Sequence, residues 1–282
     1  MSIQSLLFAP EWGFLRFAVL IGVLISPALG VIGSFVVTRR ISSLAGASAH
    51  AALGGFGLAL FLQRACGLGW VTPTGGALAG SLAAALIVGI VSITAKERED
   101  TIIGAVWALG MSIGLLFLDH TPGYVEWQSY LFGNILLLSR TDLYLTLALD
   151  AVVLIPVVIF FPQLLAMLFD STFAELRGVK GNFIYLAMLA LTAMTIVLMI
   201  NLVGIMLVIA LLTLPAAAAA CYTGHLKSMM LLGALFNALF VVSGLVASSL
   251  LNIPSGPAIV VIAGVVYIIS IGVKKLRMKI SF

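Results

Sequence analysis

Long apolar runs dominate this sequence and dictate the solvent that surrounds it. Nine runs, most of roughly 20 residues, can each cross the hydrocarbon core of a bilayer as an α-helix. They lie at about 13–37, 44–62, 75–95, 101–118, 141–161, 182–200, 202–221, 228–250 and 257–273. Only 9% of the residues are charged, against about a quarter in soluble domains, so lipid must solvate most of the surface. The sequence therefore predicts an all-α, polytopic transmembrane bundle of about eight to nine spans, forming one domain over residues 1–282.

The basic residues predict the orientation of the spans. If Arg39 and Arg40 lie in the cytoplasm and the spans alternate, eleven of the fourteen lysines and arginines fall on the cytoplasmic side. This places the N-terminus outside and the C-terminus inside, which requires an odd number of crossings. The first run lacks a basic leader and a cleavage site, so we expect it to be retained as a span.

Two segments between the runs need separate interpretations. Residues 126–139 are apolar but short, which favours a re-entrant or interfacial helix. Residues 162–181 mix leucines with charged side chains, which is typical of an amphipathic helix at the membrane surface. The pattern suits equally a linker between two halves and a helix that docks a cytoplasmic partner.

Few polar residues lie within the runs, where a charge at the bilayer centre costs about 2.5–3.5 kcal/mol on insertion scales. His50 lies ten residues after Arg40, and Asp150 lies ten residues after Arg140. At 1.5 Å per residue, both lie roughly 15 Å into their spans, close to the midplane. Asn237 reaches a similar depth, counted from Lys227.

His50 is the strongest candidate for a metal ligand. A neutral imidazole binds zinc and iron and, less tightly, manganese. Small residues surround His50 in the sequence and leave room for a pathway; the alternative is a histidine that only bonds a neighbouring span. Asp150 either ligates a cation or bonds a hydroxyl. One hypothesis is that the Asp150 carboxylate faces His50 across the pathway.

The remaining reactive side chains are weaker candidates. His120, with Asp119 and Glu126, lies in a predicted external loop that either attracts cations or is simply solvated. His225 is expected at the surface. Cys66 and Cys221 have no metal-site spacing and are expected to be small buried apolar residues.

The sequence contains no GxxxxGK[ST] run or other phosphate loop, so any ATP that drives the protein binds to another chain. No cofactor is expected on this chain. The basic residues lie in short clusters between apolar runs, which does not suggest nucleic acid.

Several stretches resemble the integral permeases of the ABC importers for manganese, zinc and iron. They are RRISSLAGASAHAALGGFGLAL (39–60), EDTIIGAVWALGMSIGLLFL (99–118), SYLFGNILLLSRTDL (129–143), NLVGIMLVIALLTLPAAAAACY (201–222) and LNIPSGPAIVVIAGVVYIIS (251–270). Together they cover about residues 35–273 in the order of that family.

The resemblance implies a multi-pass protein of the bacterial inner membrane that forms a homodimer. It also implies two cytoplasmic ATPase subunits and an external solute-binding protein, periplasmic or lipid-anchored, as partners. It favours the docking interpretation of the amphipathic segment, with a coupling helix at about 163–178. The residues implied in ATPase coupling are Asp170, Ala174, Glu175, Arg177 and Gly178.

Two positions depart from the family pattern. Family members commonly carry an aspartate four residues before the histidine, as in GDALSH, and residues four apart share a helix face. Here His50 matches the histidine, but the aspartate position is Gly46, and a family proline is replaced by Gly54.

The function expected from the resemblance is that of a non-enzymatic permease subunit that imports divalent zinc, manganese or iron by alternating access. A permease for a metal chelate or another small solute is the first alternative. An ion-coupled secondary transporter that works alone is the second, and inverted repeats with several mid-membrane charges would favour it.

Overall fold

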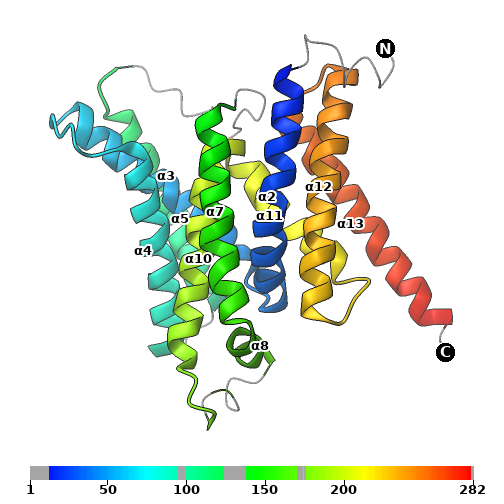
Figure 1. The fold of residues 1–282 in the computed structure, drawn as a ribbon. Helices are drawn as coiled ribbons and strands as arrows, with labels where there is room; N and C mark the ends of the chain where they lie inside the picture. The colour runs from blue at the N-terminus through cyan, green and yellow to red at the C-terminus, as the bar shows by residue number, and fades with distance from the viewer. Residues whose placement is uncertain (1–12, 95–98, 124–137, 170–173, 175, 281–282) are drawn as a thin grey trace. The chain divides into compact units, whose positions relative to one another are not determined.

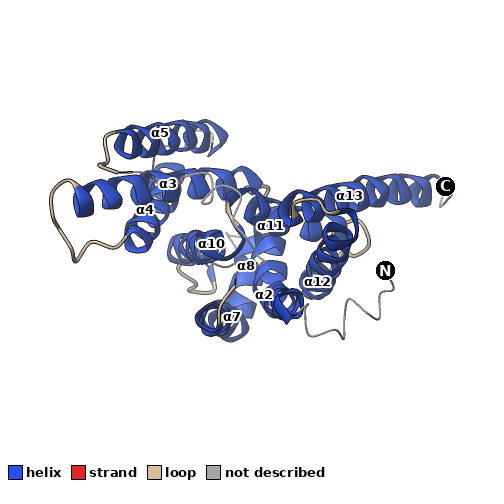
Figure 2. Cartoon of the chain, turned by 90° about the horizontal axis from the view of Figure 1, so that it is seen from above, coloured by secondary structure: helices blue, strands red, loops and turns tan. Residues whose placement is uncertain are grey.

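The structure, a computed structural model, describes residues 13–94, 99–123, 138–169, 174 and 176–280. This part of the chain contains helices and turns and no strand (Figure 2). The helices labelled in Figure 1 are α2 (Gly13–Thr38), α3 (Ser42–Arg64), α4 (Pro73–Thr94), α5 (Glu99–Asp119), α7 (Arg140–Ile159), α8 (Phe161–Phe169), α10 (Gly181–Val203), α11 (Ile205–Ala219), α12 (Leu226–Leu251) and α13 (Ser255–Ile280).

The helices confirm the all-α prediction and the count of eight to nine spans. Among the described residues, eight helices are long and apolar enough to cross a membrane, and α11 is a shorter apolar helix of 15 residues. Gly204 separates α10 from α11 with a φ of +83°, a conformation that favours a residue without a Cβ. The predicted re-entrant segment at 126–139 falls almost entirely on residues 124–137, outside the described part of the chain.

The described helices form two compact units. Unit 1 contains α2, the first part of α7, α11, α12 and α13, whereas unit 2 contains α3, α4, α5, the last turn of α7, α8 and α10. At the passages that fall on described residues, the chain moves from one unit to the other near a positive φ or a proline. Arg40, with a φ of +59°, lies between α2 and α3; Pro156 lies inside α7; and Gly204 follows α10.

Unit 2 is built around α3, which lies between α4 and α5 (Figure 2). Glycines on α3 face glycines on α5. A Cβ added at Gly54 would lie 2.7 Å from the Gly110 carbonyl oxygen, and one added at Gly57 would lie 2.5 Å from that of Gly114. Backbones that approach this closely leave no room for side chains, as is common between membrane helices.

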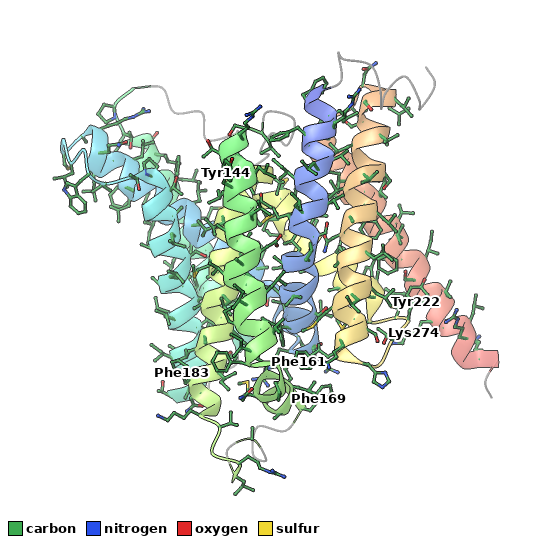
Figure 3. The ribbon with its side chains drawn as sticks, viewed as in Figure 1. Tyr144, Phe161, Phe169, Phe183, Tyr222 and Lys274 are labelled. Carbon is green, nitrogen blue, oxygen red and sulfur yellow. The ribbon has the colours of Figure 1, made fainter. Side chains whose placement is uncertain are left out.

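Unit 1 packs α11 against α12 and α13, and glycines again permit close approach. A Cβ added at Gly30 of α2 would lie 2.7 Å from the Cα of Ala234 in α12. The start of α2 and the end of α13 lie at opposite ends of unit 1 (Figure 1), in agreement with an odd number of crossings. Tyr222 and Lys274 lie near the end of unit 1 where α13 finishes (Figure 3). There the Tyr222 hydroxyl donates a hydrogen bond to Ser270 Oγ at 3.2 Å.

Candidate functional site

His50 lies near the middle of α3 and packs against an aromatic side chain from α5. Its imidazole stacks on the indole of Trp107, with ring centroids 5.0 Å apart and ring planes inclined by 23°. The His50 side chain is half-buried, and its Nδ1 atom is buried with no hydrogen-bond partner among the described residues. An unpaired buried nitrogen is costly, so this imidazole has unused capacity to bind.

The same indole covers Gly46, one helical turn before His50. A Cβ added at Gly46 would lie 2.5 Å from Cη2 of Trp107 and 3.0 Å from its Cε3. Position 46 therefore cannot carry a side chain unless the indole moves. Trp107 fills the place where the resemblance implies an aspartate.

Asp150 lies in α7 and belongs to unit 1. Its side chain is half-buried, and its Oδ1 atom is buried with no partner among the described residues. The backbone N–H of Ala28 in α2, next to Pro27, donates a hydrogen bond to the carboxylate. Because His50 belongs to unit 2, the pairing of Asp150 with His50 stays a prediction. No group of three or more His, Cys, Asp or Glu side chains meets within the described residues.

The segment expected to couple to an ATPase begins with α8. Leu164 and Met167, three residues apart, are buried, whereas Phe169 is 67% exposed, so α8 is amphipathic. Phe161, Phe169 and Phe183 lie at the same end of unit 2 (Figure 3).

A tight turn follows α8. Ala174 is fully buried, and its carbonyl oxygen accepts hydrogen bonds from the backbone N–H groups of Arg177 and Val179. Gly178 has a φ of +78°, and Leu176 is 84% exposed. The other two implied coupling residues, Asp170 and Glu175, lie outside the described residues.

A cavity of about 690 Å³ lies beside this turn, in unit 2. Its walls come from the end of α7, α8, residues 178–180 and the first half of α10, and most of its lining side chains are apolar. Gln163 and Lys180 are the polar residues in the wall, and Oε1 of Gln163 is buried with no partner among the described residues.

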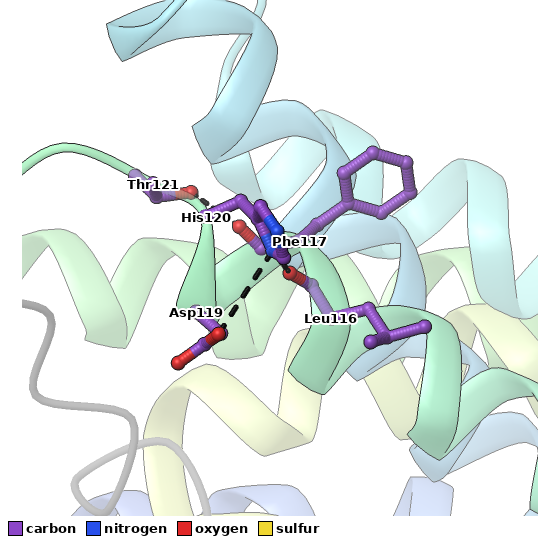
Figure 4. A network of polar contacts seen from close by, with 5 residues as sticks. All are labelled: Leu116, Phe117, Asp119, His120 and Thr121. Carbon is purple, nitrogen blue, oxygen red and sulfur yellow. Dashed lines mark hydrogen bonds and ion pairs between the residues drawn. The ribbon is translucent and has the colours of Figure 1, made fainter.

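The weaker candidates are exposed. His120 and Asp119 are 69% and 85% exposed, and 3.9 Å separates His120 Nδ1 from Asp119 Oδ2 (Figure 4). The same nitrogen lies 2.9 Å from the Leu116 carbonyl oxygen. Glu126 lies outside the described residues, and His225 is exposed at the start of α12.

The buried polar residue Asn237 donates from Nδ2 to the Gly233 carbonyl oxygen at 3.2 Å. This bond stays within α12. Its Oδ1 atom has no partner among the described residues.

The cysteine prediction was wrong for Cys66. Cys66 is exposed because it lies beyond the end of α3, in the loop that leads to α4. Cys221 is half-buried, and its Sγ donates to the Ala217 carbonyl oxygen at 3.5 Å.

Sequence reasoning missed Trp107 and Gln163. Nothing in the sequence marks Gln163, but Gly46 offered a signal for Trp107. Where a helix face loses a side chain, the freed volume must be filled from a neighbouring helix, because interiors are close-packed.

Comparisons with known proteins agree with this architecture. The model of the ABC 3 transport family matches residues 11–274. A probable metal transport system membrane protein of Chlamydia pneumoniae is 37% identical over 89% of this chain and 85% of its own length. The manganese transport system membrane protein MntC of Listeria innocua is 31% identical over 92% of this chain and 90% of its own length.

Solved structures show the same fold. PsaBC from Streptococcus pneumoniae, in complex with a Fab, matches with a TM-score of 0.80 and 30% identity, over 95% of this chain and 93% of its own. A putative metal-chelate type ABC transporter in an inward-facing conformation matches with a TM-score of 0.70 at 14% identity, over 95% of this chain and 87% of its own, which shows the fold alone.

Proposed function

Because this chain belongs to the ABC 3 transport family, we propose that it is the permease subunit of an ATP-driven importer of divalent zinc, manganese or iron. It works in the bacterial inner membrane by alternating access, and its two units form one permease domain over residues 1–282. The family match spans both units, and two relatives are named for metal or manganese transport. The chain itself does no covalent chemistry.

The complete transporter contains a second copy of this chain, two cytoplasmic ATPase subunits and an external solute-binding protein. Family membership supports these partners, since ABC transport requires an ATPase and this sequence has no phosphate loop. The binding protein supplies the high affinity for the ion. A transit site within the spans must release the ion again, so it binds more weakly.

The ion passes His50 and Asp150 at half-depth. The observation that carries this proposal is the buried Nδ1 of His50, which has no partner among the described residues. The hydroxyl of Ser48, two residues earlier on α3, is also buried with no partner among them. Asp150 supplies the second ligand, and its buried Oδ1 also has no partner among the described residues.

Metal uptake by cells that carry His50→Ala tests this pathway. Loss of a residue that only supports a metal ligand already costs about 10- to 100-fold, so we expect uptake of radioactive zinc, manganese and iron to fall by at least about tenfold. His225→Ala is the matched control because its imidazole is exposed, and it should transport like the wild type. Wild-type uptake by His50→Ala, at equal protein in the membrane, would contradict the proposal.

The turn after α8 docks on the ATPase subunits, and the expected coupling residues are Asp170, Ala174, Glu175, Arg177 and Gly178. The buried Ala174 acts by shaping the turn through its carbonyl oxygen. The exposed Leu176 among the coupling residues supports this docking, since an apolar side chain that is 84% exposed in a turn suits a contact with a partner. Leu176→Glu should abolish metal-dependent ATP hydrolysis by the assembled transporter. Leu276→Glu, at a 61% exposed leucine of α13, is the control, and equal loss in both variants would refute docking at this turn.

A further inference from the structure

The cavity of about 690 Å³ in unit 2 is a groove along the first half of α10. Its α10 wall consists of residues three or four apart, which share one helix face: Ile184, Ala187, Met188, Leu191 and Met194. From Lys180 to Met194 the chain advances 14 residues, or about 21 Å. The hydrocarbon region of one leaflet is about 15 Å deep, so this α10 groove is long enough for a lipid chain that enters from one side of the membrane.

The walls of the α10 groove are suited to hydrocarbon. Val157, Leu164 and Met188 are buried at its base, whereas Phe160 and Phe183 are 51% and 70% exposed, so the groove opens at the surface of unit 2 (Figure 3). A water molecule needs two to four polar partners, and most of this wall offers none. An apolar chain therefore fills the groove better than water does.

Two polar side chains in the wall define what the apolar chain must carry. Oε1 of Gln163 is buried with no partner among the described residues, and a buried acceptor without a donor is costly. Lys180 is exposed and positively charged, and neither α8 nor α10 contains an Asp or Glu. The occupant needs an anionic group for Lys180 and a hydrogen-bond donor for Gln163, both joined to hydrocarbon.

The location of the groove fits an anionic phospholipid. The Arg39 guanidinium lies 5.3 Å from the ring centroid of Tyr185 in α10, so Arg39 and Lys180 lie at the same end of unit 2. Basic residues gather at the cytoplasmic ends of spans, and the cytoplasmic leaflet carries the anionic lipids. A second copy of this chain would cover the groove with an apolar span, which supplies neither the anion nor the donor.

We propose that the α10 groove binds an anionic phospholipid of the cytoplasmic leaflet. Its phosphate pairs with Lys180, a headgroup hydroxyl or ammonium donates to Gln163 Oε1, and one acyl chain lies along α10. Gly178 and Val179 belong both to the wall of the groove and to the turn after α8. The lipid thus lies against the turn that, under the proposed function, docks on the ATPase, but the site itself does not depend on the ion transported.

Photolabelling of the full-length permease in phosphatidylcholine vesicles tests the site. The probe is phosphatidylglycerol with a diazirine at the end of one acyl chain, and mass spectrometry locates the label. With the headgroup at Lys180, the label should fall on α10 between Ile184 and Met194. Unlabelled phosphatidylglycerol should displace the probe at a concentration about fivefold lower than phosphatidylcholine, as expected for one lysine near the surface.

Two variants separate the charge from the groove. Lys180→Gln should abolish the fivefold preference for phosphatidylglycerol, whereas Lys274→Gln, at an exposed lysine of α13, should keep it. Ala187→Trp should remove most of the label, because the indole fills the groove. Ala83→Trp, at an exposed alanine of α4 in the same unit, is the matched control and should be labelled like the wild type.

A comparison of two anionic lipids tests the role of Gln163. Phosphatidylmethanol has the charge of phosphatidylglycerol but no donor in its headgroup, so it should displace the probe about threefold less well from the wild type, the worth of one hydrogen bond. In Gln163→Leu the two lipids should compete equally. Gln63→Leu is the control, because Gln63 does not line the groove.

Three results would overturn the inference. Label found only outside α10 would remove the site, and equal competition by phosphatidylglycerol and phosphatidylcholine in the wild type would reduce the groove to a gap that any acyl chain fills. Cross-links between two copies of the chain through the groove, without label on α10, would assign it to a second copy. If Ala187→Trp fails to fold, the exposed Lys180→Gln and the headgroup comparison still decide. Loss of the proposed function would leave all these readouts unchanged, because lipid binding requires no transport.

Discussion

The helices that carry His50 and Asp150 are embedded in the protein to very different degrees. In an apolar stretch of 18 residues taken from each helix, 72% of the residues are buried inside the protein in α3, whereas 22% are buried in α7. His50 contacts the indole of Trp107, from α5 in the same unit, whereas Asp150 depends on the backbone N–H of Ala28 in α2.

This contrast shows two ways to keep an ionisable residue inside a membrane span. On α3 the surroundings are built from small residues that let whole helices close around the imidazole. On α7 the exposed side chains are large and apolar, such as Ile155 and Val158, and polar atoms of the backbone supply the compensation. Changes in packing should therefore affect the His50 region most, and changes in polar contacts should affect the Asp150 region most.

The largest effect should come from a bulky residue in the seam between α3 and α5. Gly54→Leu places a side chain against the Gly110 backbone, where an added Cβ already lies 2.7 Å from the carbonyl oxygen. We expect a loss of about 3 kcal/mol or more in stability, seen as a lower melting temperature in detergent and less permease in the membrane. Gly264→Leu, where a Cβ meets nothing within 4 Å, should melt near the wild type; equal melting of both variants would break the comparison.

An intermediate effect is expected at Asp150. Asp150→Asn keeps the size of the side chain and removes its charge, so metal uptake should fall about tenfold while the melting temperature changes little. Asp119→Asn is a suitable control because that carboxylate is 85% exposed. Unchanged transport by Asp150→Asn would leave the carboxylate without a ligand role and confine the ion path to the α3 side.

The smallest effect concerns the start of α7. Both the backbone N–H and the hydroxyl of Ser139 donate to Asp142 Oδ2 at 2.7 Å, which resembles a capping box. Asp142→Ala should cost about 1 kcal/mol of stability, measured by thermal unfolding in detergent. The matched Asp119→Ala, at the other end of a span, should cost nothing; a larger loss there would mean that capping does not anchor α7.

The positions of the spans could be predicted closely from hydropathy. The run at 44–62 became α3, Ser42–Arg64, and the run at 202–221 became the shorter α11, because Gly204 and the turn after Ala219 cut it at both ends. Cys66 was misplaced because a general preference of cysteine for burial says nothing about a residue beyond a helix end. The depth of His50 and Asp150 was predicted by counting residues, but their neighbours were not.

Sequence alone determined that this chain crosses a lipid bilayer repeatedly, because hydrophobic length acts locally along the chain, and helical rise predicts an imidazole and a carboxylate at half-depth. Tertiary structure decided that an indole from α5 fills the space over Gly46 and stacks on His50. Trp107 and His50 are far apart in the sequence, and only the close approach of two glycine-lined helices brings their rings together. Side-chain volume is shared between neighbouring helices, so the reason for a missing side chain on one helix is found on another.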